Sequence, residues 1–349
     1  YGSSRYREAF GAYQAILLRY HWRFGLAAFA VFLALGLGLG VVGQRELSLS
    51  FLGLSLAAPL VLYKWLVRRG AYALLEPRLA AVGGGLYLFL YLGLAVSLLR
   101  MELLNPFTAL LAMALAALSV AEVIRFRLKT GPARNVDPSE IRALHWGYGG
   151  WALLASVLSW VPGNFYVFAL AIFSDLVDAG RFKVLSTLLM PVVYFNSSMM
   201  QVFLPLLSGV MAGDMNMKRK GFIFFYFQLA IQGLWGAIWG WVLYLSGNQL
   251  VTALVGGEYL FESRIFFMLL ISSLALSALT AFSTLLRAAN FPNRLTVGWL
   301  ISALFTVSLG CVLVPYGGLD GAVFSSALVN VISLFVMAIL SRKVLRWWS

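Results

Sequence analysis

The feature that most constrains this chain is a succession of long apolar runs with almost no charged side chains. A bilayer core about 30 Å thick requires roughly 20 apolar residues per helix. Ten segments meet this requirement: 24–42, 50–66, 82–99, 106–124, 150–174, 184–210, 221–245, 264–286, 295–314 and 321–340. The runs do not alternate between apolar and polar residues, as the strands of a membrane barrel do. The sequence therefore predicts an all-α integral membrane protein with ten transmembrane helices.

Charged side chains are too scarce to cover a soluble protein of this size. They make up 11% of the 349 residues, whereas 61% of the residues are hydrophobic. A soluble domain carries about 25% charged residues because its surface faces water. The net charge of +13 therefore does not indicate nucleic-acid binding, and we expect no nucleic-acid partner. Two histidines and one cysteine argue against a metal site, and we expect no cofactor.

The distribution of basic residues predicts how the chain is oriented. Of the 26 Lys and Arg residues, 21 fall in the termini and connections that the ten spans assign to one side, and five fall on the other side. Connections on the cytoplasmic side of a membrane carry the excess of basic residues. Both termini of the chain are therefore predicted to be cytoplasmic.

The longest basic connection, residues 125–149, separates the first four spans from the last six. We take residues 1–124 as an N-terminal lobe and residues 150–349 as a C-terminal six-helix lobe. A similar proline-containing turn precedes a span in each lobe, EPRL at 76–79 and FPNRL at 291–295. Parallel repeats of this kind relate the two halves of several transporter folds. This repeat predicts six helices per lobe, with the first two helices preceding the first residue.

Three segments carry local signals. The sequence WVPGN at 160–164 is expected to kink or locally unwind the fifth span, because proline removes a helical hydrogen bond. Residues 5–22 and 138–149 are amphipathic. Each stretch either lies along the cytoplasmic interface or extends the span that follows it as a helix.

Four motifs of the C-terminal lobe follow one another in a recognisable order. They are DAGRF at 178–182, LVTALVGGEY at 250–259, LLRAAN at 285–290 and VPYGGLDGA at 314–322. In this order and at these positions between spans, they resemble the polysaccharide flippases (Wzx-type, O-antigen and teichoic-acid exporters). These flippases belong to the multidrug/oligosaccharidyl-lipid/polysaccharide exporter superfamily. The resemblance covers residues 150–349, whereas the first 149 residues match mainly in layout.

The resemblance implies two six-helix lobes that face each other around a central cavity, which opens alternately to the two sides. It implies transport of a polyprenyl-diphosphate-linked oligosaccharide to the outer leaflet of a bacterial cytoplasmic membrane. Membrane lipids and other polysaccharide-assembly proteins would be the partners. Because ten spans are predicted rather than twelve, it also implies that this chain is an N-terminally truncated form of the fold.

A diphosphate can enter a membrane only where cations or hydrogen-bond donors replace its water. Arg181 and Lys183 are the leading candidates, because they begin a span on the side that is otherwise poor in basic residues. Asp175 and Asp178 lie close by in the sequence and are candidates for ion coupling. The alternative for all four residues is a salt-bridged turn at the membrane surface.

Amide side chains inside the spans are the other candidates for lining a cavity. Asn164, Asn196 and Gln201 lie in the fifth and sixth spans. Each amide either contacts a sugar hydroxyl or bonds to a neighbouring helix, which is the commoner role of amides inside membranes. Gln228 and Gln232 of the seventh span are expected to bond to neighbouring helices. Glu122, near the end of the fourth span, is expected to form an ion pair or to serve as a coupling carboxylate.

Two other classes of function stay open. The first is a membrane-embedded polysaccharide polymerase or glycosyltransferase. We do not favour an enzyme, because the connections opposite the basic side are short and the sequence lacks H-E-x-x-H, G-x-S-x-G and Walker phosphate-binding motifs. The second is a drug exporter of the same superfamily, whose cavity would be rich in acidic rather than basic residues.

Overall fold

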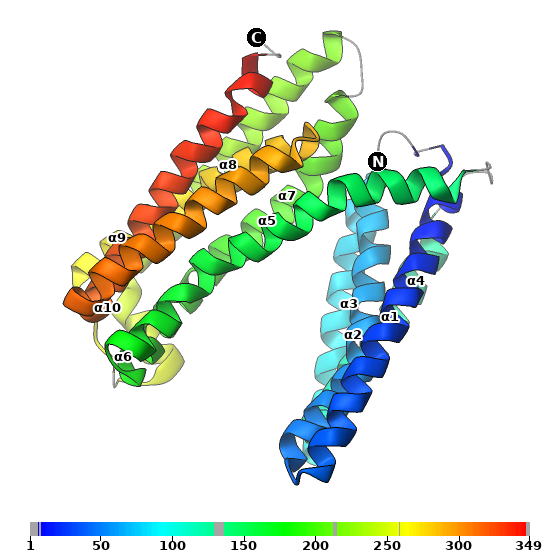
Figure 1. The fold of residues 1–349 in the computed structure, drawn as a ribbon, viewed down its shortest axis with the longest axis horizontal. Helices are drawn as coiled ribbons and strands as arrows, with labels where there is room; N and C mark the ends of the chain where they lie inside the picture. The colour runs from blue at the N-terminus through cyan, green and yellow to red at the C-terminus, as the bar shows by residue number, and fades with distance from the viewer. Residues whose placement is uncertain (1–5, 7, 129–135, 212–214, 258, 347–349) are drawn as a thin grey trace. The chain divides into compact units, whose positions relative to one another are not determined.

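The computed structural model describes residues 6, 8–128, 136–211, 215–257 and 259–346 (Figure 1). Within these residues all regular secondary structure is α-helical, in ten helices. The chain divides into two compact units, Tyr1–Ile141 and Arg142–Ser349. The boundary falls inside the predicted connection 125–149, of which residues 129–135 lie outside the described part of the chain.

The first unit is built from four long helices, coloured blue to cyan in Figure 1. They are α1 (Phe10–Val41), α2 (Arg45–Ala73), α3 (Pro77–Arg100) and α4 (Pro106–Arg127). Helix α2 packs against both α1 and α4, and α3 packs against α4. Small residues permit this close packing, since a Cβ atom on Gly53 would lie 2.8 Å from the Cβ of Leu110. Small residues at helix contacts are typical of membrane bundles, where dispersion contacts replace the hydrophobic effect.

A reciprocal capping box defines where α4 begins. The side chain of Asn105 accepts a hydrogen bond from the backbone N–H of Thr108 at 3.0 Å. The Thr108 hydroxyl in turn accepts one from the backbone N–H of Asn105 at 2.9 Å, with Pro106 at the first helical position of α4. This reciprocal pair satisfies backbone donors that a helix start otherwise leaves without partners.

The second unit contains the remaining helices. They are α5 (Pro138–Phe173), α6 (Leu176–Leu188), α7 (Met190–Met211), α8 (Met215–Val255), α9 (Ser263–Ala288) and α10 (Pro292–Arg346). The first turn of α5 belongs to the first unit by contact, and the rest of this helix belongs to the second. Helix α9 packs against α7, α8 and α10, and it is the most deeply buried of the candidate spans.

Helix α10 is a hairpin of two helices joined at Gly318. This residue has φ 51° and ψ −131°, a conformation that only glycine adopts without strain. On either side of the bend, the two arms run antiparallel. The Arg294 guanidinium donates to the Leu340 carbonyl at 3.1 Å, and the hydroxyls of Ser302 and Ser333 are in contact.

The structure confirms the predicted fold class of membrane-spanning helices. Among the described residues, nine helices are long and apolar enough to cross a membrane. The 55-residue α10 is one of the nine, and its two arms contain the predicted ninth and tenth spans. All ten predicted spans thus fall within helices, although the sixth is divided between α6 and α7 at Leu189.

Three local expectations change. Helix α5 stays helical through Pro162, so the chain does not unwind at 160–164, and the alternative of a kink there stays a prediction. The stretches 10–22 and 138–149 belong to the same helices as the spans that follow them, which favours helical extension over separate interfacial helices. The connection expected at 246–263 is largely helical, because α8 departs from helical geometry at Ser246 and then continues to Val255.

Candidate functional site

The predicted charged site of Asp175, Asp178 and Arg181 lies at the end of the second unit where α10 bends. Asp175 caps α6, since its carboxylate accepts the backbone N–H of Asp178 at 2.6 Å. The carboxylate of Asp178 accepts the Ser174 hydroxyl at 2.8 Å and lies 3.5 Å from the guanidinium of Arg181. The guanidinium of Arg181 also lies 5.8 Å from the ring centroid of Tyr259, a cation–π contact. Arg181 is therefore neutralised locally, as in the salt-bridged alternative.

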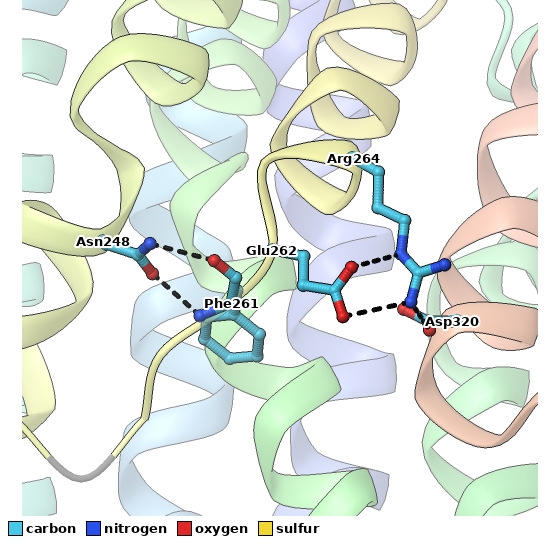
Figure 2. A network of polar contacts seen from close by, with 5 residues as sticks. All are labelled: Asn248, Phe261, Glu262, Arg264 and Asp320. Atoms are coloured by element: carbon cyan, nitrogen blue, oxygen red, sulfur yellow. Dashed lines mark hydrogen bonds and ion pairs between the residues drawn. The ribbon is translucent and has the colours of Figure 1, made fainter.

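A second charged group lies at the same end of the unit (Figure 2). Arg264, in the first turn of α9, pairs at 2.8 Å with Glu262 and at 2.8 Å with Asp320, which follows the bend of α10. The amide of Asn248 makes two hydrogen bonds of 2.9 Å with the backbone of Phe261, one as donor and one as acceptor. These contacts fasten the segment between α8 and α9 to the bend of α10. Exposed ion pairs of this kind contribute little individually, about 0–1 kcal/mol.

A buried cluster of amides joins three helices inside the second unit. Asn196 of α7 donates to the hydroxyl of Ser277 of α9 at 3.2 Å. Gln232 of α8 donates to the backbone carbonyl of Asn196 at 3.1 Å. Gln228 donates to the side-chain oxygen of Gln232 at 3.3 Å and to the hydroxyl of Thr284 at 3.2 Å. Because Asn196, Gln228 and Gln232 are all buried, the cluster connects helices as expected for amides in a membrane bundle.

The other two candidate amides make contacts within their own helices. Asn164 donates to the carbonyl of Trp160 at 3.0 Å, and Gln201 donates to the carbonyl of Ser197 at 3.4 Å. The side-chain oxygen of Gln201 is buried and has no hydrogen-bond partner among the described residues. Lys183 is exposed on α6. The structure thus does not bring the five cavity candidates together as one cluster.

Glu122 belongs to a polar cluster inside the first unit. Its carboxylate accepts the hydroxyl of Tyr63 at 2.6 Å, and its second oxygen lies 3.7 Å from the guanidinium of Arg125. The ring of His21 stacks on Tyr63 with centroids 6.1 Å apart, and the His21 Nε2 lies 3.1 Å from the Pro59 carbonyl oxygen. The ion pair expected for Glu122 is present. Its role in coupling stays a prediction.

Lys64 is a residue whose position the sequence did not reveal. Its ammonium lies 3.1 Å from the ring centroid of Tyr87, and the residue is 8% exposed. The signal in the sequence was a single cation near the end of the predicted span 50–66. The structure instead places Lys64 between α2 and α3, where the aromatic face replaces an acidic partner.

The described residues contain no group of three or more His, Cys, Asp or Glu side chains that could hold a metal ion. The substrate and coupling roles of Arg181, Lys183, Asp175 and Asp178 stay predictions. Asp175, Asp178 and Arg181 lie together in the N-cap and first two turns of α6.

No protein-family model matches the sequence, and no curated protein matches it. Solved structures match its fold. The chain aligns with a multidrug resistance MATE family transporter of the MOP superfamily, in its outward-facing conformation, with a TM-score of 0.79 and 13% identity over 98% of this chain and 80% of that one. It aligns with the Vibrio cholerae MATE transporter VcmN in the bent form with a TM-score of 0.65 and 17% identity over 93% and 77% of the two chains. It aligns with the eukaryotic MATE transporter AtDTX14 with a TM-score of 0.66 and 14% identity, over 97% of this chain and 80% of that one.

These likenesses show that the chain has the fold of MATE transporters. The MOP superfamily is the one in which the resemblance of the four sequence motifs placed the chain. A likeness at 12–17% identity shows the fold alone and does not single out the polysaccharide flippases.

Proposed function

We propose that the chain is a membrane exporter that carries amphiphilic, drug-like organic molecules across the bilayer by alternating access. The observation that carries this proposal is the alignment of 98% of the chain with a multidrug resistance MATE transporter at a TM-score of 0.79. A fold supports more than one function, so the choice of cargo depends on the chemistry of the described residues.

The pairing of Arg181 favours a drug-like cargo over a lipid-linked diphosphate. A diphosphate requires cations that are not already neutralised, because a buried anion is stabilised only by partners that replace its water. Arg181 instead pairs with Asp178 at 3.5 Å. The amide of Asn196 is engaged with Ser277 inside the second unit. Amphiphilic organic molecules place fewer demands on fixed charges, since they bind chiefly through apolar and aromatic contacts.

Flipping of a polyprenyl-diphosphate-linked oligosaccharide is the second candidate. One observation favours it: Glu122 is the single acidic residue within the ten predicted spans. A carrier for cationic drugs would be expected to place more carboxylates there, because they attract and desolvate a cationic cargo. The order of the four motifs in residues 178–322 supports the same candidate.

The two candidates are separated by one experiment with two cargoes. The chain is expressed in a bacterial strain that lacks its own drug exporters, and the accumulation of a fluorescent cationic dye is measured against an empty vector. In parallel, lipid-linked oligosaccharide is quantified on the cytoplasmic leaflet in a strain deleted for the gene. Reduced dye accumulation with normal lipid-linked oligosaccharide supports drug export. Unchanged dye accumulation with stranded lipid-linked oligosaccharide refutes it and supports the flippase, and no effect in either assay refutes both.

A further inference from the structure

Lys64 is a buried cation inside the first unit that the proposed function does not use. Its ammonium lies 3.1 Å from the ring centroid of Tyr87 on α3, and the residue is 8% exposed. The ring of Tyr87 stacks in turn on that of Tyr91, with centroids 6.2 Å apart. Within the described part of the chain, no carboxylate pairs with Lys64. An aromatic face attracts an ammonium but carries no net charge, so the ring leaves the positive charge of Lys64 without compensation.

Arg68 lies one helical turn after Lys64 and adds a second cation to the same face of α2. Its guanidinium donates to the hydroxyl of Tyr72 at 3.2 Å and lies 6.0 Å from the ring centroid of Trp65. The Nε of Arg68 is buried and has no hydrogen-bond partner among the described residues. Two neighbouring cations repel each other, and a buried donor without an acceptor is costly. An anion bound beside them would relieve both costs.

The packing of α3 leaves room beside this pair of cations. Helices α2 and α3 are in contact, are joined by the short turn 74–76 and run in opposite directions. Lys64 lies level with Tyr87, so one helical turn closer to the connection Arg68 lies level with Gly84. A Cβ atom on Gly84 would have no neighbour within 4 Å. The absence of a side chain at Gly84 therefore leaves open space at the level of the Arg68 guanidinium.

The two cations lie where a membrane places its headgroups. Lys64 is near the end of the predicted span 50–66, and Arg68 follows that span at the end predicted to be cytoplasmic. Trp65 is exposed, and exposed tryptophans are typical of the membrane interface. Toward the middle of the membrane, Leu62 of α2 and Leu88 of α3 are exposed as well. An acyl chain would find apolar contacts there, next to the two cations.

We propose that Lys64 and Arg68, with the open space at Gly84, bind the phosphate headgroup of an anionic phospholipid. Ammonium and guanidinium groups both donate to phosphate oxygens, and these charge-assisted hydrogen bonds are strong. The headgroup reaches the site from the side of Arg68, which is only partly buried. It supplies an acceptor for the Arg68 Nε and a counter-charge for Lys64. Basic pockets between membrane helices bind anionic headgroups in this way.

Lipid binding is measured on the purified full chain in a neutral detergent, by native mass spectrometry. Phosphatidylglycerol, phosphatidylcholine and inorganic phosphate are added separately. Phosphatidylglycerol should bind at least about tenfold more tightly than phosphatidylcholine, because each cation near an anionic headgroup contributes about fivefold. Lys64→Met should weaken phosphatidylglycerol binding by about fivefold for the same reason. Lys64→Arg keeps the charge and should retain most of the affinity.

Gly84→Leu tests the open space without changing any charge. The leucine side chain would fill the room beside Arg68, so phosphatidylglycerol binding should weaken although both cations are present. Gly85→Leu is the matched control, because a Cβ there also meets no neighbour within 4 Å but points about 100° further around α3. Arg69→Ala is the control for charge, because Arg69 is exposed and adjacent to Arg68 in the sequence. Both controls should leave the affinity for phosphatidylglycerol unchanged.

Three results would overturn the proposal. Equal losses in Lys64→Met and Arg69→Ala would mean that net charge alone attracts the lipid. Unchanged binding in Gly84→Leu, or the same loss in Gly85→Leu, would mean that the headgroup does not lie between α2 and α3. Saturation by inorganic phosphate with no preference for phosphatidylglycerol over phosphatidylcholine would mean that the site takes a free anion. The measurement does not depend on transport, so its outcome is independent of the proposed cargo.

Discussion

The buried amide pair of α8 allows a quantitative test of how the second unit is held together. Gln228 makes two hydrogen bonds, to Gln232 and to Thr284, and Gln232 makes one more, to the carbonyl of Asn196. A hydrogen bond between membrane helices contributes about 0.6 kcal/mol on average, and about 1 kcal/mol in soluble proteins. Gln228→Leu and Gln232→Leu each remove two bonds, so each should lower the free energy of unfolding by about 1–2 kcal/mol.

The double substitution removes three bonds in all, because the bond between the two glutamines is shared. The combined loss should therefore be smaller than the sum of the single losses by about 0.6–1 kcal/mol. The free energy of unfolding is measured by denaturant titration in mixed micelles, with tryptophan fluorescence as the signal and linear extrapolation. Gln201→Leu is the control, since this residue donates only within its own helix, and its effect should add to that of Gln232→Leu. Additivity of the Gln228 and Gln232 substitutions within about 0.3 kcal/mol would refute the shared bond.

Two further predictions follow from the bend of α10 and from the first predicted site. Gly321→Ala should lower the free energy of unfolding by about 1–3 kcal/mol, because the added Cβ would lie 2.1 Å from the Leu313 carbonyl oxygen. Gly317→Ala, whose Cβ would have no neighbour within 4 Å, is the control in the same unfolding titration, and equal losses would contradict the reasoning. Arg181→Ala and Lys183→Ala should leave dye export unchanged at equal expression, because the cargo proposed here needs no free cation. A large loss of export in either variant would contradict this expectation and would indicate that the residue lines the transport cavity.

The positions of the spans could be predicted from the sequence because the hydrocarbon core of a membrane constrains each helix separately. Each crossing needs an unbroken apolar run, and the run is visible without knowledge of its neighbours. Within the second unit the predicted spans place Arg264, at the start of the eighth span, and Asp320, just before the tenth span, on the same side, and the two residues lie 2.8 Å apart. Arg294 and Arg342 were assigned to the other side and line one hollow.

The hydrogen-bond and cation–π partners of polar side chains could not be predicted from the sequence in the same way. The contact of Asn196 with Ser277 joins residues 81 positions apart, and no periodicity within either helix specifies it. Lys64 lies near the end of the predicted span 50–66, where a cation is usually solvated. Its aromatic partner Tyr87 lies on another helix. Unwinding at Pro162 was expected from local chemistry alone, yet α5 accommodates the proline without leaving helical geometry.

Transport by the purified chain is the direct test of the proposed drug export. The chain is reconstituted into liposomes, a proton or sodium gradient is imposed in separate experiments, and uptake of a fluorescent cationic dye is followed against empty liposomes. We expect dye movement above the empty-liposome rate under at least one gradient, with saturation as the dye concentration rises. Dye movement equal to that of empty liposomes under both gradients, with folded protein present in the membrane, would contradict the assignment of this chain as a drug exporter.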